Sequence, residues 1–234
     1  MVRVAIMQPY FLPYIGYFQM IKAVDVFVFY DDVNYIKRGW INRNKILVNQ
    51  EGQYLTIPLR EASQNKKINE IKTGIDTKEL SRIFKTVEFS YKNAPYYAQV
   101  FPLLERILKL DSEFISDLAI ESVKTLSEYL NLKTKFLISS KAFPETQSME
   151  RGNRLMEICH QLGAVNYINA IGGQEIYTKE DFAREKIHLS FIQSNNISYS
   201  QFGANFVPWL SILDVLMFNS PEVVNEFLNQ YELI

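Results

Sequence analysis

The amino-acid sequence predicts an α/β protein with an open, mostly parallel sheet and helices on both faces. Short apolar runs of strand length at 2–7 and 25–30 are separated by a helical stretch at 15–23. A strand, a helix and a second strand in this order are typical of two parallel strands joined by a right-handed crossover. Strand-like runs and amphipathic helices keep alternating further along the chain, which indicates one α/β architecture.

Two further features shape the predicted fold. Residues 45–59 are typical of an early hairpin, with Asn49-Gln50-Glu51-Gly52 as its turn. A helical insertion is expected at about 76–131, where Asp76 followed by Glu79 resembles a capping box. Strands are expected again at 135–139, 166–170 and 188–192, with helices at 148–161, 174–185 and after Ser220-Pro221.

Length and composition limit the class of protein. With 234 residues, of which 47% are apolar, the chain is expected to form a single domain, 1–234, that contains the helical insertion. The net charge of −1 gives no reason to expect a nucleic-acid partner. One cysteine excludes an intramolecular disulfide, and no apolar run reaches the roughly 20 residues that span a bilayer. The N-terminus lacks a secretion signal, so the expected location is the cytoplasm.

Two adjacent carboxylates, Asp31 and Asp32, come directly after the second predicted strand. Polar groups at the carboxyl ends of parallel strands are typical of ligand sites. On a continuing strand the two side chains point to opposite faces, so we expect one to face the site and the other a structural partner. A carboxylate here can hold a sugar hydroxyl or amine, act as a base or bind Mg²⁺, although the sequence requires no metal. The alternative is that both cap the following turn.

Gln8 follows the first predicted strand in the same way, and its amide can both donate and accept hydrogen bonds. We therefore expect Gln8 to contact the ligand; the alternative is a core amide that satisfies backbone groups. The aromatic residues that follow mostly predict core packing, and Tyr10 is also a candidate stacking wall beside a ligand.

A basic, amide-rich loop follows the carboxylates and supplies further candidates for ligand contact: Arg38, Asn42, Arg43 and Asn44. Guanidinium groups bind phosphate with paired hydrogen bonds, and amides bind hydroxyl groups, which together match a sugar nucleotide. Trp40 within this loop favours an ordered site. The alternative is a solvated loop whose asparagines satisfy turns.

Two later segments are also candidates. Gly172-Gly173 lies between a predicted strand and a predicted helix, where glycine lets backbone N–H groups approach an anion. It lacks the Gly-Lys-Ser/Thr ending of a P-loop, and a plain turn is the favoured alternative. Glu150 and Arg154 lie four residues apart on one predicted helix, where a surface ion pair is the alternative to a site role for Glu150.

The cysteine and the histidines do not indicate a catalytic group. Cys159 shares an apolar helix stripe with Leu155 and Leu162, which predicts a core thiol. His160 and His188 form neither a zinc motif nor a pair with a nucleophile. A Gly-x-Ser-x-Gly elbow is absent from the sequence.

Short blocks spread over nearly the whole chain carry a resemblance to a known family: Gln8-Pro9, Phe11-Leu12-Pro13, Gly16-Tyr17-Phe18, Asp31-Asp32-Val33, Asn42-Arg43-Asn44, Ile57-Pro58, Glu150, Asn153-Arg154, Leu162-Gly163-Ala164, Gly172-Gly173 and Ser211-Ile212-Leu213-Asp214. In these blocks the chain resembles the WbqC-like proteins of bacterial surface-polysaccharide clusters. The resemblance implies a transferase of O-antigen or capsule biosynthesis, which adds an acyl or aminoacyl group to the amino group of a nucleotide-linked amino sugar. It also implies an acyl or aminoacyl donor, which a carrier such as acyl carrier protein can present.

Two alternatives stay open at this point. The opening layout resembles nucleotidylyltransferase-type folds, which implies a nucleotidyl- or phosphate-handling transferase, but Gly16-Tyr17 lies where that superfamily carries a Gly-His pair. The lack of an evident nucleophile or metal cluster is also typical of a non-catalytic module that binds sugar nucleotides. The sequence names neither the donor, the sugar nor a cofactor.

Overall fold

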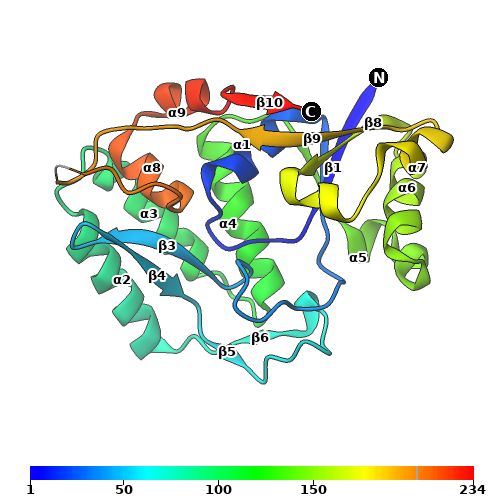
Figure 1. Cartoon of the computed structure of the whole chain (residues 1–234). Helices are drawn as coiled ribbons and strands as arrows, with labels where there is room; N and C mark the ends of the chain where they lie inside the picture. Colours follow the sequence, from blue (N-terminus) through cyan, green and yellow to red (C-terminus); the bar gives the residue numbers. More distant parts are fainter. Residues whose placement is uncertain (204) are drawn as a thin grey trace.

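The computed structural model describes residues 1–203 and 205–234, and a six-stranded sheet runs through it (Figure 1). The strands follow the order β10-β9-β8-β1-β2-β7 across the sheet. Neighbouring strands are parallel except β9 and β10, which are antiparallel. This confirms the predicted α/β class with a mostly parallel open sheet. The strands are β1 (Val2–Met7), β2 (Val26–Phe29), β7 (Lys135–Ile138), β8 (Ala164–Ala170), β9 (His188–Ser194) and β10 (Tyr231–Leu233).

The direction in which strands are added reverses at β1. From β1 the chain moves outward through β2 to β7, and then returns to place β8 and β9 on the other side of β1. β1 and β8 are therefore neighbours that belong to opposite halves of the winding. In open α/β sheets, ligands bind in the crevice that such a reversal leaves at the carboxyl ends of the strands.

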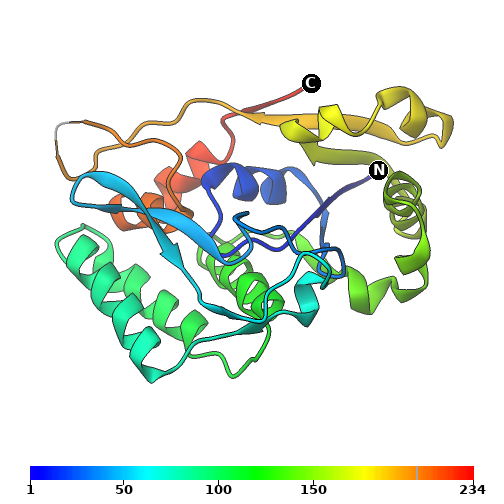
Figure 2. The same ribbon diagram turned by 60° about the horizontal axis from the view of Figure 1, so that its bottom comes forward.

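Alternate residues of β1 and β2 face two separate hydrophobic cores. Ala5, Phe27 and Phe29 pack in the larger core, whereas Val4 and Val28 pack in the smaller one. This period of two is the geometry of strands that are buried on both faces. The larger core is covered by α1 (Ile15–Ala23), α4 (Ile115–Tyr129), α8 (Ile212–Phe218) and α9 (Pro221–Phe227), and the smaller by α6 (Arg151–Gln161) and α7 (Lys179–Arg184) (Figure 2).

The early hairpin consists of β3 (Arg43–Val48) and β4 (Glu51–Thr56). Its turn is shorter than the four residues expected, because Glu51 already pairs with Val48. Asn49 and Gln50 alone make the connection, with positive φ angles of 51° and 63°. A two-residue turn with positive φ at both positions matches the twist of the strands that it joins. Two further short strands, β5 (Leu59–Arg60) and β6 (Lys72–Thr73), pair with each other.

The helices expected at about 76–131 are present as α2 (Thr77–Tyr91), α3 (Tyr97–Leu108) and α4. Asp76 caps α2, because its side chain accepts a hydrogen bond from the backbone N–H of Glu79 at 2.7 Å. No helix in the described part of the chain is both long and apolar enough to cross a membrane.

Two predicted helices differ from the structure in their boundaries. The helix expected from Ser148 begins at Arg151, because Ser148 ends the 3₁₀ helix η2 instead of capping α6. The helix expected at 174–185 is divided into a 3₁₀ helix and α7, which Thr178 caps through the N–H of Asp181. The remaining short helices are η1 (Ile68–Glu70), α5 (Ser139–Ala142), η2 (Pro144–Ser148) and η3 (Ile171–Glu175).

Candidate functional site

A cleft of about 740 Å³ opens at the carboxyl edge of the sheet, where the strand order reverses. It adjoins the carboxyl end of β1, the end that is remote from the N label in Figure 1. Its lining joins segments that are far apart in the sequence, since loops after three parallel strands meet α6 and the loop before η1. The chemically distinctive lining residues are Gln8, Tyr30, Asp32, Lys67, Arg151, Arg154, Asn169, Gly172, Gly173 and Tyr177.

Asp32 and Arg154 form a buried ion pair in the wall of the cleft. Nη2 of Arg154 lies 2.6 Å from Oδ2 of Asp32, and neither side chain is more than 3% exposed. Gln147 donates to the same carboxylate oxygen at 2.9 Å, and Ser139 donates to the other at 2.5 Å. Burial would raise the pKa of Asp32, but these three hydrogen bonds and the Arg154 charge hold that pKa below its ordinary value. Asp32 is therefore an ionised anchor for Arg154 and a weak base.

Arg154 is held in one orientation by two further contacts. Its Nε donates to Oγ1 of Thr146 at 2.9 Å, and its guanidinium carbon lies 4.7 Å from the centre of the Tyr30 ring. A cation over an aromatic face is stabilised by the ring quadrupole, more so when water is excluded. The guanidinium is therefore fixed in the wall of the cleft, where it is almost completely buried.

Asp31 is buried outside the cleft and joins two segments of the fold. Its Oδ1 accepts a hydrogen bond from the N–H of Ser140 at 3.0 Å and lies 3.0 Å from Oγ of Ser139, whose one proton is shared with the closer Asp32. Its Oδ2 accepts from Oγ of Ser140 at 2.6 Å and from Nδ2 of Asn69 at 3.2 Å. Both aspartates lie beyond the end of β2 at Phe29; Asp32 lines the cleft, and Asp31 contacts structural partners.

Gln8 lines the cleft, and Tyr10 does not. The backbone carbonyl of Gln8 accepts a hydrogen bond from the hydroxyl of Tyr17 at 2.8 Å, which fixes the chain just after β1. The Tyr10 ring packs against Tyr17 with ring centres 5.6 Å apart. Burial, and next the nearby Tyr14, raise the pKa of Tyr10 to about 12.

The two asparagines of the basic loop are structural and lie outside the cleft. Asn42 donates to the carbonyl of Ile57 at 2.8 Å and accepts from the hydroxyl of Tyr35 at 3.0 Å. Asn44 donates to the carbonyl of Leu12 at 2.9 Å. Both amides are engaged in these internal hydrogen bonds, and neither residue lines the cleft.

The two arginines of this loop contact each other and lie outside the cleft. Arg43 donates to the carbonyl of Gly39 at 3.2 Å and also to the carbonyl of Arg38. Its guanidinium carbon lies 4.2 Å from the centre of the Tyr54 ring. Arg38 has a positive φ of 61° and an exposed side chain. Arg43 therefore holds the loop in place, and it lies apart from Gln8 and Asp32, the two candidate residues that do line the cleft.

Gly172 and Gly173 line the cleft as part of η3. Gly173 is required by packing, because a Cβ at this position would meet Nδ2 of Asn169 at 2.7 Å. Nothing lies within 4 Å of a Cβ built at Gly172, so that position is open. η3 has five residues, and its backbone N–H groups do not form the start of the longer helix that the sequence predicted.

Glu150 lines a neighbouring hollow of about 610 Å³, which shares Arg151, Ile176 and Tyr177 with the cleft. The expected ion pair between Glu150 and Arg154 does not form, because the Arg154 side chain turns inward to Asp32. The backbone of Glu150 does accept the N–H of Arg154 in the first turn of α6, at 2.8 Å.

Sequence reasoning missed several residues that line the cleft, notably Tyr30, Lys67, Arg151, Asn169 and Tyr177. Asn169 had a usable signal, since it stands near the end of the strand predicted at 166–170. Tyr30, the last residue of the strand predicted at 25–30, had the same signal. Lys67, Arg151 and Tyr177 had none, because their approach to the cleft depends on how distant segments pack. Cys159 is buried, as predicted, and burial raises the pKa of its thiol to about 12. Within the described residues, no three His, Cys, Asp or Glu side chains gather to hold a metal ion.

The fold and this cleft define an open α/β protein with a polar crevice at the reversal of strand order. The chain belongs to the WbqC-like protein family, whose model matches residues 8–226. It is similar to the uncharacterized protein Rv1507c of Mycobacterium tuberculosis (strain ATCC 25618 / H37Rv), with 30% identity over 220 residues, covering 92% of this chain and 93% of the relative. No solved structure matches the chain.

Proposed function

We propose that this protein is a transferase of O-antigen or capsule biosynthesis, which adds an acyl or aminoacyl group to the amino group of a nucleotide-linked amino sugar. The observation that carries the proposal is the cleft, which brings cations, amides and aromatic rings together at the reversal of strand order. A nucleotide-linked amino sugar offers a diphosphate, hydroxyl groups and a flat base to match them. The pathway and the reaction follow from the family resemblance and not from the side chains.

Three cations support binding of the diphosphate. Arg151 and Arg154 reach the cleft from α6, and Lys67 reaches it from the loop before η1. Asp32 fixes the Arg154 guanidinium in the wall, so a phosphate that reaches it meets it in one defined orientation. Lys67 and Arg151 are less buried than Arg154, so their side chains are free to move towards a ligand that enters the cleft.

The amides support recognition of the sugar. Gln8 and Asn169 follow or end adjacent parallel strands, and each can donate and accept hydrogen bonds. In this proposal Asp32 acts by positioning Arg154 and does not take the proton of the amine, because its lowered pKa makes it a poor base. Asp31, the other candidate carboxylate, supports the junction between β2 and α5.

Two other functions compete with this proposal. The order β7-β2-β1-β8-β9 favours nucleotidyl or phosphate transfer, since phosphate-binding α/β folds use such a reversal. Tyr17, however, stands in place of the catalytic histidine of that superfamily and is buried, with its hydroxyl on the Gln8 carbonyl. Asp32, the carboxylate that lines the cleft, is already ion-paired with Arg154, and this favours a non-catalytic module that binds sugar nucleotides.

Titration of the purified protein with nucleotide-linked amino sugars tests the binding step. Arg151→Ala and Lys67→Ala should each weaken binding by about ten- to a hundredfold, the effect of losing a charge-assisted hydrogen bond of about 1.5–3 kcal/mol. Arg82→Ala is the matched control, because Arg82 is an exposed arginine on α2 that does not line the cleft. Equal losses in all three variants, or no binding of any nucleotide sugar by the parent, would reject the assignment.

Mass spectrometry of reaction mixtures tests the transfer step. With an acyl or aminoacyl donor present, the amino sugar should gain the mass of that group while the nucleotide stays attached. Release of pyrophosphate would instead identify a nucleotidyl transferase. Binding without any change of mass, across donors that include acyl carrier protein and coenzyme A thioesters, would favour the non-catalytic module.

A further inference from the structure

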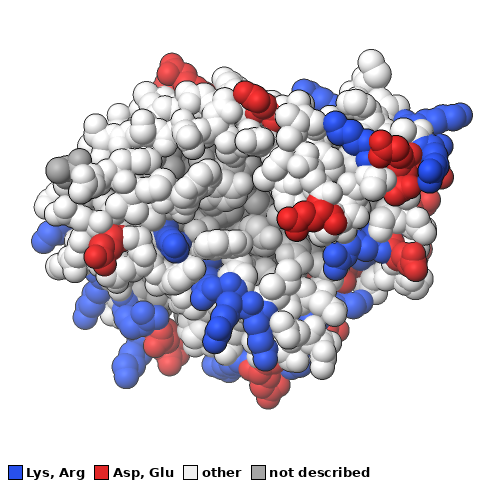
Figure 3. All heavy atoms as spheres, in the orientation of Figure 1, with Lys and Arg blue, Asp and Glu red and all other residues white. Residues whose placement is uncertain are grey.

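The segment between β9 and α8 is uncharged and rich in aromatic residues. Residues 194–213 contain no Asp, Glu, Lys, Arg or His, but they include four aromatic side chains, the last of which is Trp209. Figure 3 shows charged side chains gathered mainly at the lower and right-hand parts of the face, with the area over this segment almost free of them. A neutral surface of this kind does not suit a phosphate or a charged partner.

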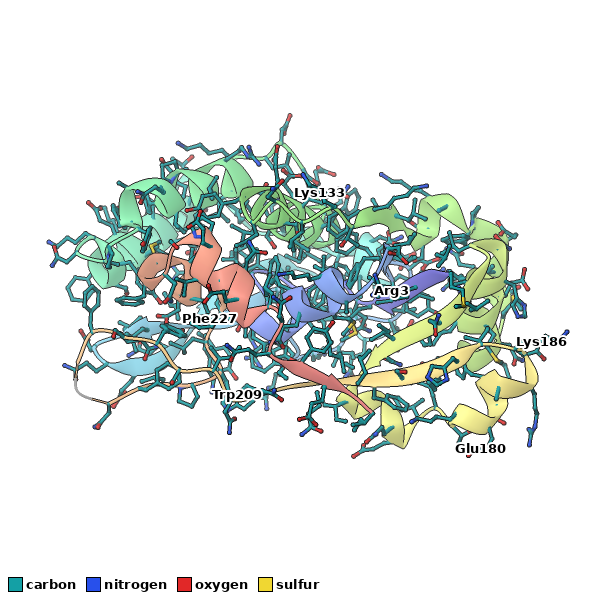
Figure 4. All side chains as sticks on the ribbon, turned by 90° about the horizontal axis from the view of Figure 1, so that it is seen from above. Arg3, Lys133, Glu180, Lys186, Trp209 and Phe227 are labelled. Atoms are coloured by element: carbon teal, nitrogen blue, oxygen red, sulfur yellow. The ribbon has the colours of Figure 1, made fainter. Side chains whose placement is uncertain are left out.

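Trp209 is held in an unfavourable conformation and exposes its ring. Its φ is +60°, in the left-handed region that is rare for a bulky side chain, and the residue is 60% exposed. Figure 4 shows it at the rim of the molecule. The chain directly after it is fixed, because the N–H of Ser211 donates to Lys45 and that of Ile212 donates to Pro13, both at 2.8 Å. Strained backbone that neighbouring hydrogen bonds fix, while the side chain stays exposed, is typical of functional positions.

Trp209 faces a second aromatic ring and a set of neutral polar groups. The Tyr14 ring lies 6.3 Å from the Trp209 ring, at an angle of 55°. The two rings border a hollow of about 50 Å³ whose polar lining comes from Ser194, Asn195 and Asn196 at the carboxyl end of β9. A Cβ at Gly16 would collide with both Ser194 and Tyr14, so glycine at this position lets the two approach.

We propose that Trp209 and Tyr14 form a binding site for an uncharged pyranose ring. One face of a pyranose consists of C–H groups that pack on an aromatic ring, while its hydroxyl groups need neutral donors and acceptors such as amides. The hollow is too small for a whole sugar, so the ring lies on Trp209 and one substituent enters between Ser194 and the two asparagines. This site does not depend on the function proposed for the cleft.

The site belongs to the same edge of the sheet as the cleft. Tyr14 stands six positions after Gln8 in the chain, which limits the distance between their Cα atoms to about 20 Å. Tyr10 lies between them in the chain, and the nearby Tyr14 adds to the raised pKa of Tyr10. A sugar at Trp209 therefore sits beside the cleft, where a glycan acceptor or a second sugar unit of the same ligand can reach it.

The two tryptophans of the chain, Trp40 and Trp209, allow a direct test. In Trp40→Phe the fluorescence reports Trp209 alone. Addition of a neutral pyranose from a panel of glucose, galactose, mannose, rhamnose and N-acetylglucosamine should shift this emission to the blue and reduce its quenching by acrylamide. No response to any of the five sugars overturns the proposal, as does a response to uridine only. A change on dilution without sugar also overturns it, since Trp209 would then contact a second copy.

Trp209→Gly separates binding from structure. Glycine adopts a positive φ without steric penalty, so the melting temperature should stay the same or rise. Saturation-transfer NMR should nevertheless lose the signal of the sugar ring protons, which Trp40→Phe retains. A marked fall in melting temperature would show that Trp209 is structural and would overturn the proposal. The Arg151→Ala variant changes the cleft and should still bind the neutral sugar at Trp209. A failure of the cleft assignment can therefore be distinguished from a failure of the Trp209 site.

Discussion

Arg154 connects the smaller core, the cleft and the chain after β2 through one guanidinium group. Its partner Asp32 is 122 residues away in the sequence, and both side chains are withdrawn from water. Burial of two charges is costly, and attraction between them offsets that cost only when the geometry and the other hydrogen bonds are good. The hydrogen bonds that Ser139 and Gln147 donate to Asp32, and the one that Thr146 accepts from Arg154, meet this condition.

The first prediction concerns this pair. Asp32→Asn should lower the free energy of unfolding by about 3–5 kcal/mol at neutral pH, because it leaves a buried guanidinium without a counter-charge. Arg154→Met alone should cost a similar amount. The double variant should be clearly more stable than the sum of the two losses implies, as urea unfolding can measure. Strictly additive losses would contradict a coupled ion pair.

A second buried carboxylate, Asp214, has neutral partners and the opposite pH dependence. Its oxygens accept hydrogen bonds from the hydroxyls of Tyr91 and Tyr199, both at 2.7 Å, and from Gln201 at 2.8 Å. Burial raises the pKa of Asp214, and these bonds oppose the rise only in part. The folded state therefore holds this proton more tightly than the unfolded state does.

The second prediction follows from that sign. Above about pH 4, the ordinary value for aspartate, the contribution of Asp214 to stability should decline as the pH rises through its folded-state pKa. Asp32, whose folded-state pKa is lowered, contributes in the opposite sense and loses its contribution as the pH falls. Asp214→Asn should flatten the decline, which unfolding curves recorded from pH 4 upward can show. The same slope in parent and variant would rule out Asp214 as its source.

At the scale of elements, the loop before the hairpin is stabilised by its own arginine. Arg43 binds two carbonyls of the turn at 38–39 and stacks on Tyr54 of β4. These contacts join the loop to the hairpin. They occupy the Arg43 guanidinium group, which the sequence had indicated as a candidate ligand for phosphate. The polar composition of the loop is thus explained by local structure, the alternative that the sequence left open.

The third prediction tests this assignment. Arg43→Ala should lower the free energy of unfolding by roughly 1–2 kcal/mol, from the lost hydrogen bonds and the cation–π contact, and leave the affinity for nucleotide sugars unchanged. Arg43→Lys should recover part of the stability, since an ammonium keeps the charge without the fork. Calorimetric titration and a thermal melt of each variant provide both numbers. Weaker binding without a change in stability would restore Arg43 as a phosphate ligand.

The elements that the sequence predicted best are those whose signal is local. The run at 2–7 alternates between two cores, and Asp76 lies three residues before Glu79, so strand and cap could both be read from a few neighbours. The helix expected at 174–185 fails because a 3₁₀ helix and a new cap at Thr178 interrupt it, and periodicity does not report such a break. Gln8 and Asp32 were found by the strand-end rule, whereas Lys67 and Arg154 approach the cleft only through tertiary packing.

At the scale of the whole molecule, α6 links the smaller core to the cleft. Cys159 lies on the buried face of this helix, and Arg151 and Arg154 of the same helix line the cleft. Any opening that exposes the thiol by detaching α6 must therefore also remove two of the three cations proposed for the ligand. Stability of the smaller core and occupancy of the cleft are coupled for this reason.

The fourth prediction uses this coupling. A thiol reagent should label native Cys159 very slowly, because the thiol is buried and its pKa of about 12 leaves almost no reactive thiolate at neutral pH. A nucleotide sugar at 100 times its dissociation constant should slow the labelling about 100-fold, since it binds only the closed state. A pyranose bound at Trp209 should slow the labelling only slightly if α6 detaches by itself. If the whole molecule must unfold, the pyranose should slow the labelling by the full factor that its own concentration and dissociation constant predict.

The Cys159→Ala variant is the control for labelling at other positions, and it should bind the nucleotide sugar with the affinity of the parent. If a nucleotide sugar that is known to bind leaves the labelling rate unchanged, the ligand lies away from α6, and Arg151 and Arg154 do not belong to its site.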